Sequence, residues 1–149
     1  MTDNKLDISR ATEAIKDARF VDALSLLESN LAKDPNHIDS LYLAAVSSRY
    51  LKNYDGAKKY IQSLLTQAPD MGRAYQELGH LNRDIGNQEN SIAHYRQACE
   101  LNPALLSSWK ALYDYFRKNK NKPAADHAFM QMNTLQSIPS VLLYISQIL

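Results

Sequence analysis

Three prolines recur at a constant interval along this chain of 149 residues. Pro35, Pro69 and Pro103 are each 34 residues apart, and each follows a segment whose apolar residues have helical spacing. Because a proline cannot continue a helical hydrogen-bond ladder, each of the three is expected to end a helix. A constant period of about 20–50 residues is typical of repeat architectures. The period therefore constrains the fold more strongly than any other feature of the sequence.

The segment 72–103 shows the repeating unit most clearly. Its first half places Tyr75, Leu78 and Leu81 at i, i+3 and i+6, a spacing that predicts an amphipathic helix. After a break at Gly86-Asn87, a second helical stripe runs toward Pro103; it consists of Ile92, Tyr95, Ala98 and Leu101. Each unit is therefore predicted to be a pair of short helices joined by a tight turn.

The rest of the chain follows the same pattern, so we expect an all-α fold in a single domain over residues 1–149. Apolar residues nowhere alternate with period two over a convincing length, and no β-strand is predicted. The first helix is expected over residues 6–16. The units are expected as a divergent first repeat over 4–36, repeats over 37–70, 71–104 and 105–137, and the start of a fifth unit or a capping helix over 138–149.

The small, aromatic and proline residues resemble the tetratricopeptide repeat, a helix pair of ~34 residues with the pattern W-x2-L-G-x2-Y, A-x3-F and a closing proline. The matching residues in segment 71–104 are Tyr75, Leu78, Gly79, Ser91, Tyr95, Ala98 and Pro103. The neighbouring units match through Leu41, Ala44, Ala45, Ala57, Ile61, Leu64, Pro69, Trp109, Leu112, Tyr113, Phe116, Ala125 and Phe129. The resemblance implies a right-handed α-solenoid of antiparallel helix pairs that acts as a non-catalytic protein–protein interaction module.

In this family the first helix of each unit lines a concave groove, and the resemblance assigns a set of polar residues to that face. Arg49, Arg83 and Arg117 recur there with the 34-residue period. The other candidate residues of the groove are Tyr42, Val46, Tyr50, Arg73, Gln76, His80, Lys110 and Asp114. Because arginine binds carboxylates bidentately, the expected partner is a protein or peptide with acidic groups. The competing interpretation is that the arginines are solvated or pair with Asp84 and Asp114.

Two alternatives arise from the last third of the chain. The segment 109–149 loosely resembles the repeat region of bacterial tetratricopeptide-repeat sulfotransferases, which implies an N-terminal accessory region of a longer multidomain enzyme. The segment after Pro139 is apolar nearly all round, which favours burial on more than one side. Its candidates for self-association as a homodimer are Val141, Leu142, Tyr144, Ile145, Ile148 and Leu149.

Composition argues against several other classes of function. The formal net charge of +1 provides no global electrostatic case for nucleic acid or an anionic membrane. No apolar run approaches the ~18 residues of a membrane helix, and with no signal peptide we expect a cytoplasmic protein. Cys99 is the only cysteine, and the four histidines form no paired motif, so no cofactor or metal is predicted. Since no catalytic motif is present, the chain is not expected to be an enzyme.

Overall fold

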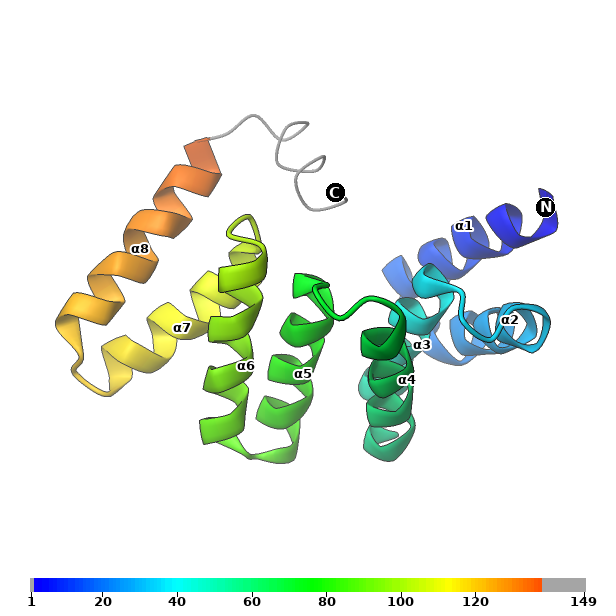
Figure 1. The fold of residues 1–149 in the computed structure, drawn as a ribbon, viewed down its shortest axis with the longest axis horizontal. Helices are drawn as coiled ribbons and strands as arrows, with labels where there is room; N and C mark the ends of the chain where they lie inside the picture. Colours follow the sequence, from blue (N-terminus) through cyan, green and yellow to red (C-terminus); the bar gives the residue numbers. More distant parts are fainter. Residues whose placement is uncertain (1, 138–149) are drawn as a thin grey trace. The chain divides into compact units, whose positions relative to one another are not determined.

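The computed structural model describes the backbone of residues 2–137 and the side chains of residues 7–137, and this part of the chain is all-α (Figure 1). The helices are α1 (Thr2–Lys16), α2 (Phe20–Lys33), α3 (Ile38–Tyr50), α4 (Tyr54–Gln67), α5 (Gly72–Ile85), α6 (Gln88–Leu101), α7 (Leu106–Lys118) and α8 (Lys122–Ser137). The predicted all-α fold of helix pairs is confirmed. Among the described residues, no helix has the length and apolar character needed to span a membrane.

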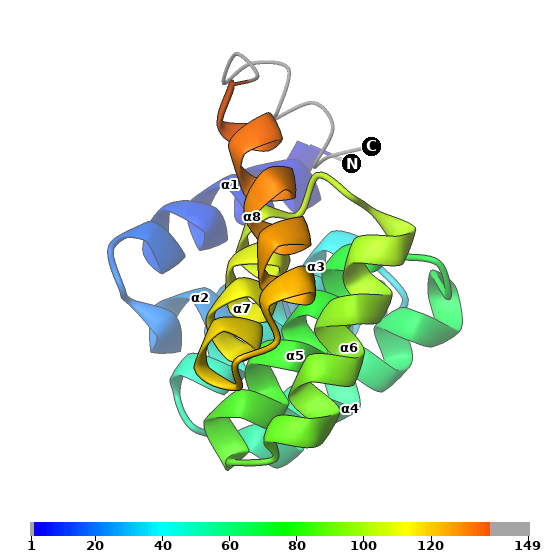
Figure 2. The ribbon, with the colours of Figure 1, turned by 90° about the vertical axis from the view of Figure 1, so that its left-hand side faces the viewer.

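The chain divides into two compact units after Pro69, which lies at a predicted repeat boundary. The first unit contains α1–α4 and the second α5–α8. Within the first unit, α2 packs on α1 and α3, and α3 packs on α4. Within the second, α6 packs on α5 and α7, and α7 packs on α8, as Figure 2 shows from the side of α8. Each unit is therefore a stack of two consecutive helix pairs.

Helix ends agree with the proline period. The second helices α2, α4 and α6 each end two residues before Pro35, Pro69 and Pro103, as expected. The helix α8 has no proline in phase and is longer, with 16 residues. One boundary was wrong: α1 begins at Thr2 rather than at residue 6. Its first turn is polar, so an apolar stripe could not mark it. The predicted fifth unit over 138–149, with its self-association residues, lies outside the described residues.

A left-handed residue follows the first helix of every pair, again with the 34-residue period. Ala18, Lys52, Gly86 and Lys120 have φ angles of 59°, 63°, 93° and 58°. At the third turn, the Asn87 N–H donates to the Asn82 carbonyl at 2.8 Å and the Gly86 N–H to the Arg83 carbonyl at 3.0 Å. The other three turns have the same two bonds. This is the Schellman motif, which satisfies helix C-terminal carbonyls and reverses the chain.

The residue after the left-handed position immediately precedes the next helix. In three of the four pairs it is an asparagine, namely Asn53, Asn87 and Asn121. Each side chain accepts a hydrogen bond from the backbone N–H three residues later, at 3.0–3.3 Å. Such N-caps satisfy a helix N–H that has no partner within the helix and contribute about 1 kcal/mol each. Two adjacent residues thus end one helix and begin the next.

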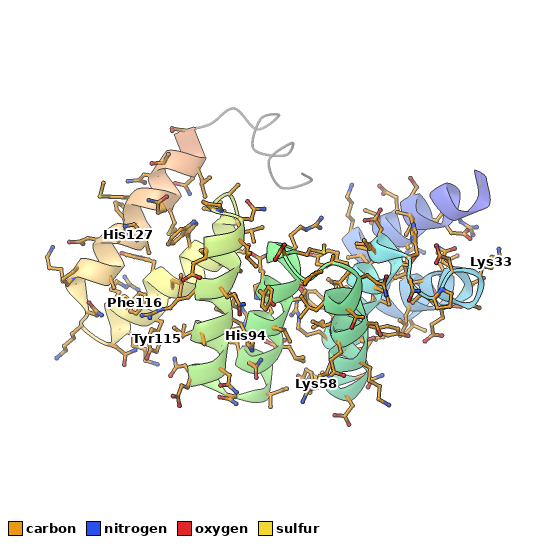
Figure 3. All side chains as sticks on the ribbon, viewed as in Figure 1. Lys33, Lys58, His94, Tyr115, Phe116 and His127 are labelled. Atoms are coloured by element: carbon orange, nitrogen blue, oxygen red, sulfur yellow. The ribbon has the colours of Figure 1, made fainter. Side chains whose placement is uncertain are left out.

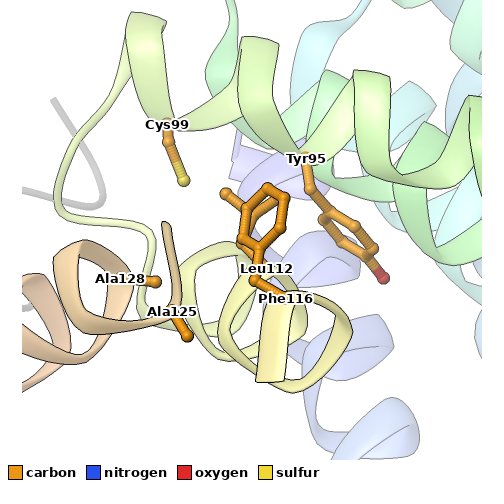
Figure 4. Packing of buried hydrophobic residues seen from close by; sticks show 6 residues of the cluster. All are labelled: Tyr95, Cys99, Leu112, Phe116, Ala125 and Ala128. Atoms are coloured by element: carbon orange, nitrogen blue, oxygen red, sulfur yellow. The ribbon is translucent and has the colours of Figure 1, made fainter. Parts of the chain in front are cut away.

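The core of the second unit lies between α6, α7 and α8 (Figure 4). Its buried residues are Tyr95, Cys99, Leu112, Phe116, Ala125 and Ala128. Small residues let the helices approach closely. On α5, a Cβ added to Gly79 would lie 2.6 Å from the Tyr95 ring, so only glycine allows this contact. The Ser91 hydroxyl also donates to the Gly79 carbonyl at 2.8 Å, which joins α6 to α5.

At the left-handed turn positions, we expect a glycine to make the protein more stable than a residue with a Cβ does. Lys120→Gly should raise the free energy of unfolding by about 0.5–1 kcal/mol, because a left-handed residue with a Cβ is strained by about 1–2 kcal/mol. Gly86→Ala should lower it by a similar amount. Urea unfolding followed through Trp109, the only tryptophan, reports on the second unit. Lys120→Ala is the matched control and should change little, since it removes the charge and keeps the Cβ.

Candidate partner-binding surface

In the first unit, the predicted binding residues lie on α3. Val46 and Arg49 are buried, Tyr42 is half-buried and Tyr50 is exposed. The Tyr50 ring stacks on Phe20 of α2 with centroids 4.5 Å apart and an interplanar angle of 3°. The Arg49 guanidinium carbon lies 4.5 Å from the centroid of the same ring. The Tyr50 ring is therefore held in a fixed orientation at the end of α3.

In the second unit, the predicted residues lie on α5 and α7, and a hydrogen bond joins the two helices. The Ser108 hydroxyl donates to the Gln76 side-chain oxygen at 2.8 Å. Arg73, Gln76 and His80 on α5 are half-buried, and Arg83 is exposed. The predicted residues of α7 are all exposed; they are Lys110, Asp114 and Arg117. We call the surface formed by these seven residues the first-helix face.

Arg83 is held by two neighbours. Its Nε and Nη2 donate to one carboxylate oxygen of Asp84, both at 3.2 Å. Its Nη1 donates to the Tyr95 hydroxyl at 3.3 Å. That hydroxyl also lies 2.5 Å from Nδ1 of His80. Because a guanidinium only donates, the Tyr95 oxygen accepts from Arg83, and its own proton is available to His80. Figure 4 shows this hydroxyl pointing away from the apolar cluster.

The three periodic arginines also have a structural explanation. Arg49, Arg83 and Arg117 lie in the last turns of α3, α5 and α7. A cation there interacts favourably with the helix dipole, by about 0.3–1 kcal/mol. The guanidinium carbon of Arg117 in addition lies 5.5 Å from the centroid of the Tyr113 ring. The pairing of Arg83 with Asp84 agrees with the competing interpretation of the sequence. Recurrence of arginine is therefore not by itself evidence of a ligand.

A groove of about 310 Å³ brings part of the first-helix face together with residues of α6. It is lined by Arg83, Gly86, Gln88, Ser91, Ile92, Tyr95, Ala111, Asp114, Tyr115 and Lys118. Only Arg83 and Asp114 were predicted from the sequence as binding residues. Lys118 could have been found, because it lies 34 residues after Asp84 and 68 after Tyr50, a predicted residue. Figure 3 marks Tyr115, which precedes Phe116 in the last half of α7.

The groups with possible chemistry are dispersed. Within residues 7–137, no three His, Cys, Asp or Glu side chains are grouped so that they could hold a metal ion. His94 is half-buried, and its ring centroid lies 6.3 Å from that of Tyr75. Burial lowers the pKa of His94, so the neutral imidazole predominates at neutral pH. Burial, together with the charge of Glu100, raises the pKa of the Cys99 thiol to about 12.

Comparison with known proteins identifies the repeats. Two family models, both described as tetratricopeptide repeat, match residues 39–70 and 72–105, which overlap the repeats expected over 37–70 and 71–104. A structure of MamA from Desulfovibrio magneticus RS-1 is similar, with a TM-score of 0.71, 19% sequence identity, and coverage of 89% of this chain and 75% of that chain. Another MamA structure has a TM-score of 0.68 and 16% identity, with coverage of 97% and 79%.

A mutant of the Thermobaculum terrenum O-GlcNAc transferase is also similar in structure. The TM-score is 0.72 at 21% identity, and the match covers 77% of this chain but 22% of the transferase chain. At such identities the structural matches establish the fold alone. No curated protein matches the chain by sequence.

The raised pKa of Cys99 predicts an unreactive thiol in the folded protein. With a pKa of about 12, only about one thiol in ten thousand is ionised at about pH 8, and the thiolate is the nucleophile. Alkylation by iodoacetamide should be at least about a hundredfold slower in the native chain than in the urea-unfolded chain. Mass spectrometry against time measures both rates. Equal rates would contradict the burial of this side chain.

Proposed function

Because the chain is a tetratricopeptide-repeat protein, we propose that it is a protein-interaction scaffold whose first-helix face binds a segment of a partner protein. The segment lies across α5 and α7 and contacts polar side chains from both helices. Solenoids of this type offer rigid extended surfaces, so the partner, rather than the repeat, becomes ordered on binding.

One observation carries the proposal: the Ser108–Gln76 hydrogen bond, which joins α5 to α7 within the second unit. His80 and Arg83 on one helix, and Lys110, Asp114 and Arg117 on the other, belong to the first-helix face. Three of these side chains are cations, namely Arg83, Lys110 and Arg117, and Asp114 is an anion. The excess of positive charge favours a partner segment with acidic groups. The hydrogen bond fixes the two helices before binding, and a preformed site loses less conformational entropy.

A second candidate function is an accessory region of a larger enzyme. Support comes from the transferase above, in which a similar helical region accounts for 22% of the chain. The two functions are compatible, since an accessory region can bind the substrate protein of its own enzyme. The coding sequence beyond Leu149 tests the accessory role by itself: an open reading frame that continues into a catalytic domain supports it, and a stop codon contradicts an N-terminal accessory region.

The proposed function predicts charge-dependent peptide binding. Peptides are first selected with the wild-type chain from a phage-displayed random library. Replacing Lys110 and Arg117 together by glutamine should then weaken binding of the selected peptides about three- to tenfold, because each exposed charge contributes about 0.2–1 kcal/mol. The loss should be large at ~0.1 M salt and small at ~1 M, where the Debye length is only ~3 Å. Fluorescence anisotropy of a labelled peptide measures both affinities.

The matched control removes two positive charges elsewhere. Lys33 and Lys58 are exposed on α2 and α4, the second helices of their pairs, and both are marked in Figure 3. Lys33→Gln with Lys58→Gln should leave binding unchanged. Failure to select any peptide, or equal losses in the two double variants, would contradict a binding role for the first-helix face.

A further inference from the structure

The groove beside the α5–α6 turn is lined by two cations, Arg83 and Lys118, and by apolar side chains. We infer that it is the anchoring pocket for one acidic residue of the partner segment, with Arg83 and Lys118 as the groups that bind the carboxylate. The inference rests on the proposed function and adds the pocket, the class of ligand and a residue that lies outside the first-helix face. The contacts of the lining residues support each part of it.

The two cations differ in how they are held. Arg83 is fixed by Asp84 and by the buried Tyr95, whose relative exposure is 1%. These bonds use one N–H on each of Nη1 and Nη2, and each of these nitrogens carries a second N–H. Lys118 is exposed and makes no hydrogen bond or ion pair with any described residue. A fixed guanidinium and an adaptable ammonium that line the same groove can both donate to one carboxylate.

Tyr95 is a positioning residue in this arrangement. Its ring packs in the core against α5, where a Cβ at Gly79 would touch it at 2.6 Å. Its hydroxyl lies at the groove and accepts from Arg83. The hydroxyl therefore connects the packing of α5 on α6 to the orientation of the guanidinium. Without it, Arg83 keeps only its contact with the adjacent Asp84.

The rest of the lining limits the ligand. Ile92, Ala111 and Tyr115 give part of the lining an apolar character, which suits the stem of an acidic side chain or an apolar neighbour. Asp114 is the anion of the lining, and it too makes no hydrogen bond or ion pair with any described residue. Two cations and one anion favour a single carboxylate over a run of acidic residues. A polyphosphate such as nucleic acid would meet Asp114 and has too few cations to bind here.

Opposite charges in one groove allow an experiment with effects of opposite sign. The probe is an acidic peptide obtained in the library selection, together with a version in which the acidic residue is replaced by its amide. Lys118→Gln should weaken binding of the acidic peptide about two- to fivefold, and Asp114→Asn should tighten it about two- to fivefold. For the amide peptide both differences should vanish, as a double-mutant cycle requires of a direct interaction.

The positioning role of Tyr95 is tested in the same assay. Tyr95→Phe should weaken the acidic peptide about as much as Arg83→Gln does, while the double variant should lose little more than either single variant. Each variant is checked by urea unfolding through Trp109. If the Tyr95 hydroxyl had only a structural role, Tyr95→Phe would lower stability and would weaken binding of the acidic peptide and of its amide equally. The matched controls, Lys58→Gln and Glu28→Gln, change exposed charges on α4 and α2 and should have no effect.

Three outcomes separate this inference from the proposed function. Opposite effects of Lys118→Gln and Asp114→Asn that depend on the acidic residue support both. Selected peptides that lack acidic residues, or that are insensitive to these variants yet are weakened by the Lys110 and Arg117 double variant, overturn the pocket and leave the proposed function intact. The absence of any selected peptide overturns both.

Discussion

The left-handed turn after the first helix of each pair is the constraint on which the rest of the structure depends. At Ala18, Lys52, Gly86 and Lys120 the backbone reverses with the same pair of hydrogen bonds. The reversal places two helices antiparallel, and an asparagine cap then fixes where the second helix begins. Three of the four positions have a Cβ and are strained, so in those three pairs the packing must offset about 1–2 kcal/mol at the turn.

The same turn determines where a ligand can bind. The groove in the second unit is formed by the last turn of α5, the first turns of α6 and the last half of α7. Arg83 lies three residues before the left-handed Gly86, and Gln88 two residues after it. If α6 began one residue later, its side chains would rotate by about 100° and Tyr95 would leave the position in which its hydroxyl meets Arg83. Register at the turn therefore controls the geometry of the groove.

The sequence was sufficient to predict the helix pairs, because prolines and small residues repeat in positions that packing requires. It was less informative about the turns: only Gly86 has a residue type that indicates a left-handed conformation, and Ala18, Lys52 and Lys120 give no such signal. The three periodic arginines lie in the last turns of their helices, and whether they bind a partner could not be read from their spacing. The groove includes Tyr95 and Tyr115, whose proximity to Arg83 depends on how α6 packs between α5 and α7.

Some repeat positions are required by the fold, and others tolerate different residue types. Three repeats have an arginine at the same position, namely Arg49, Arg83 and Arg117. This is expected where each helix end favours a cation. The next position holds Tyr50, Asp84 and Lys118, which differ in size and in charge. Tyr50 stacks on Phe20, Asp84 pairs with Arg83, and Lys118 faces a groove. Because the fold accepts all three, the residue after the arginine is where recognition can vary without loss of structure, and Lys118 is the one that lines a groove with a second cation.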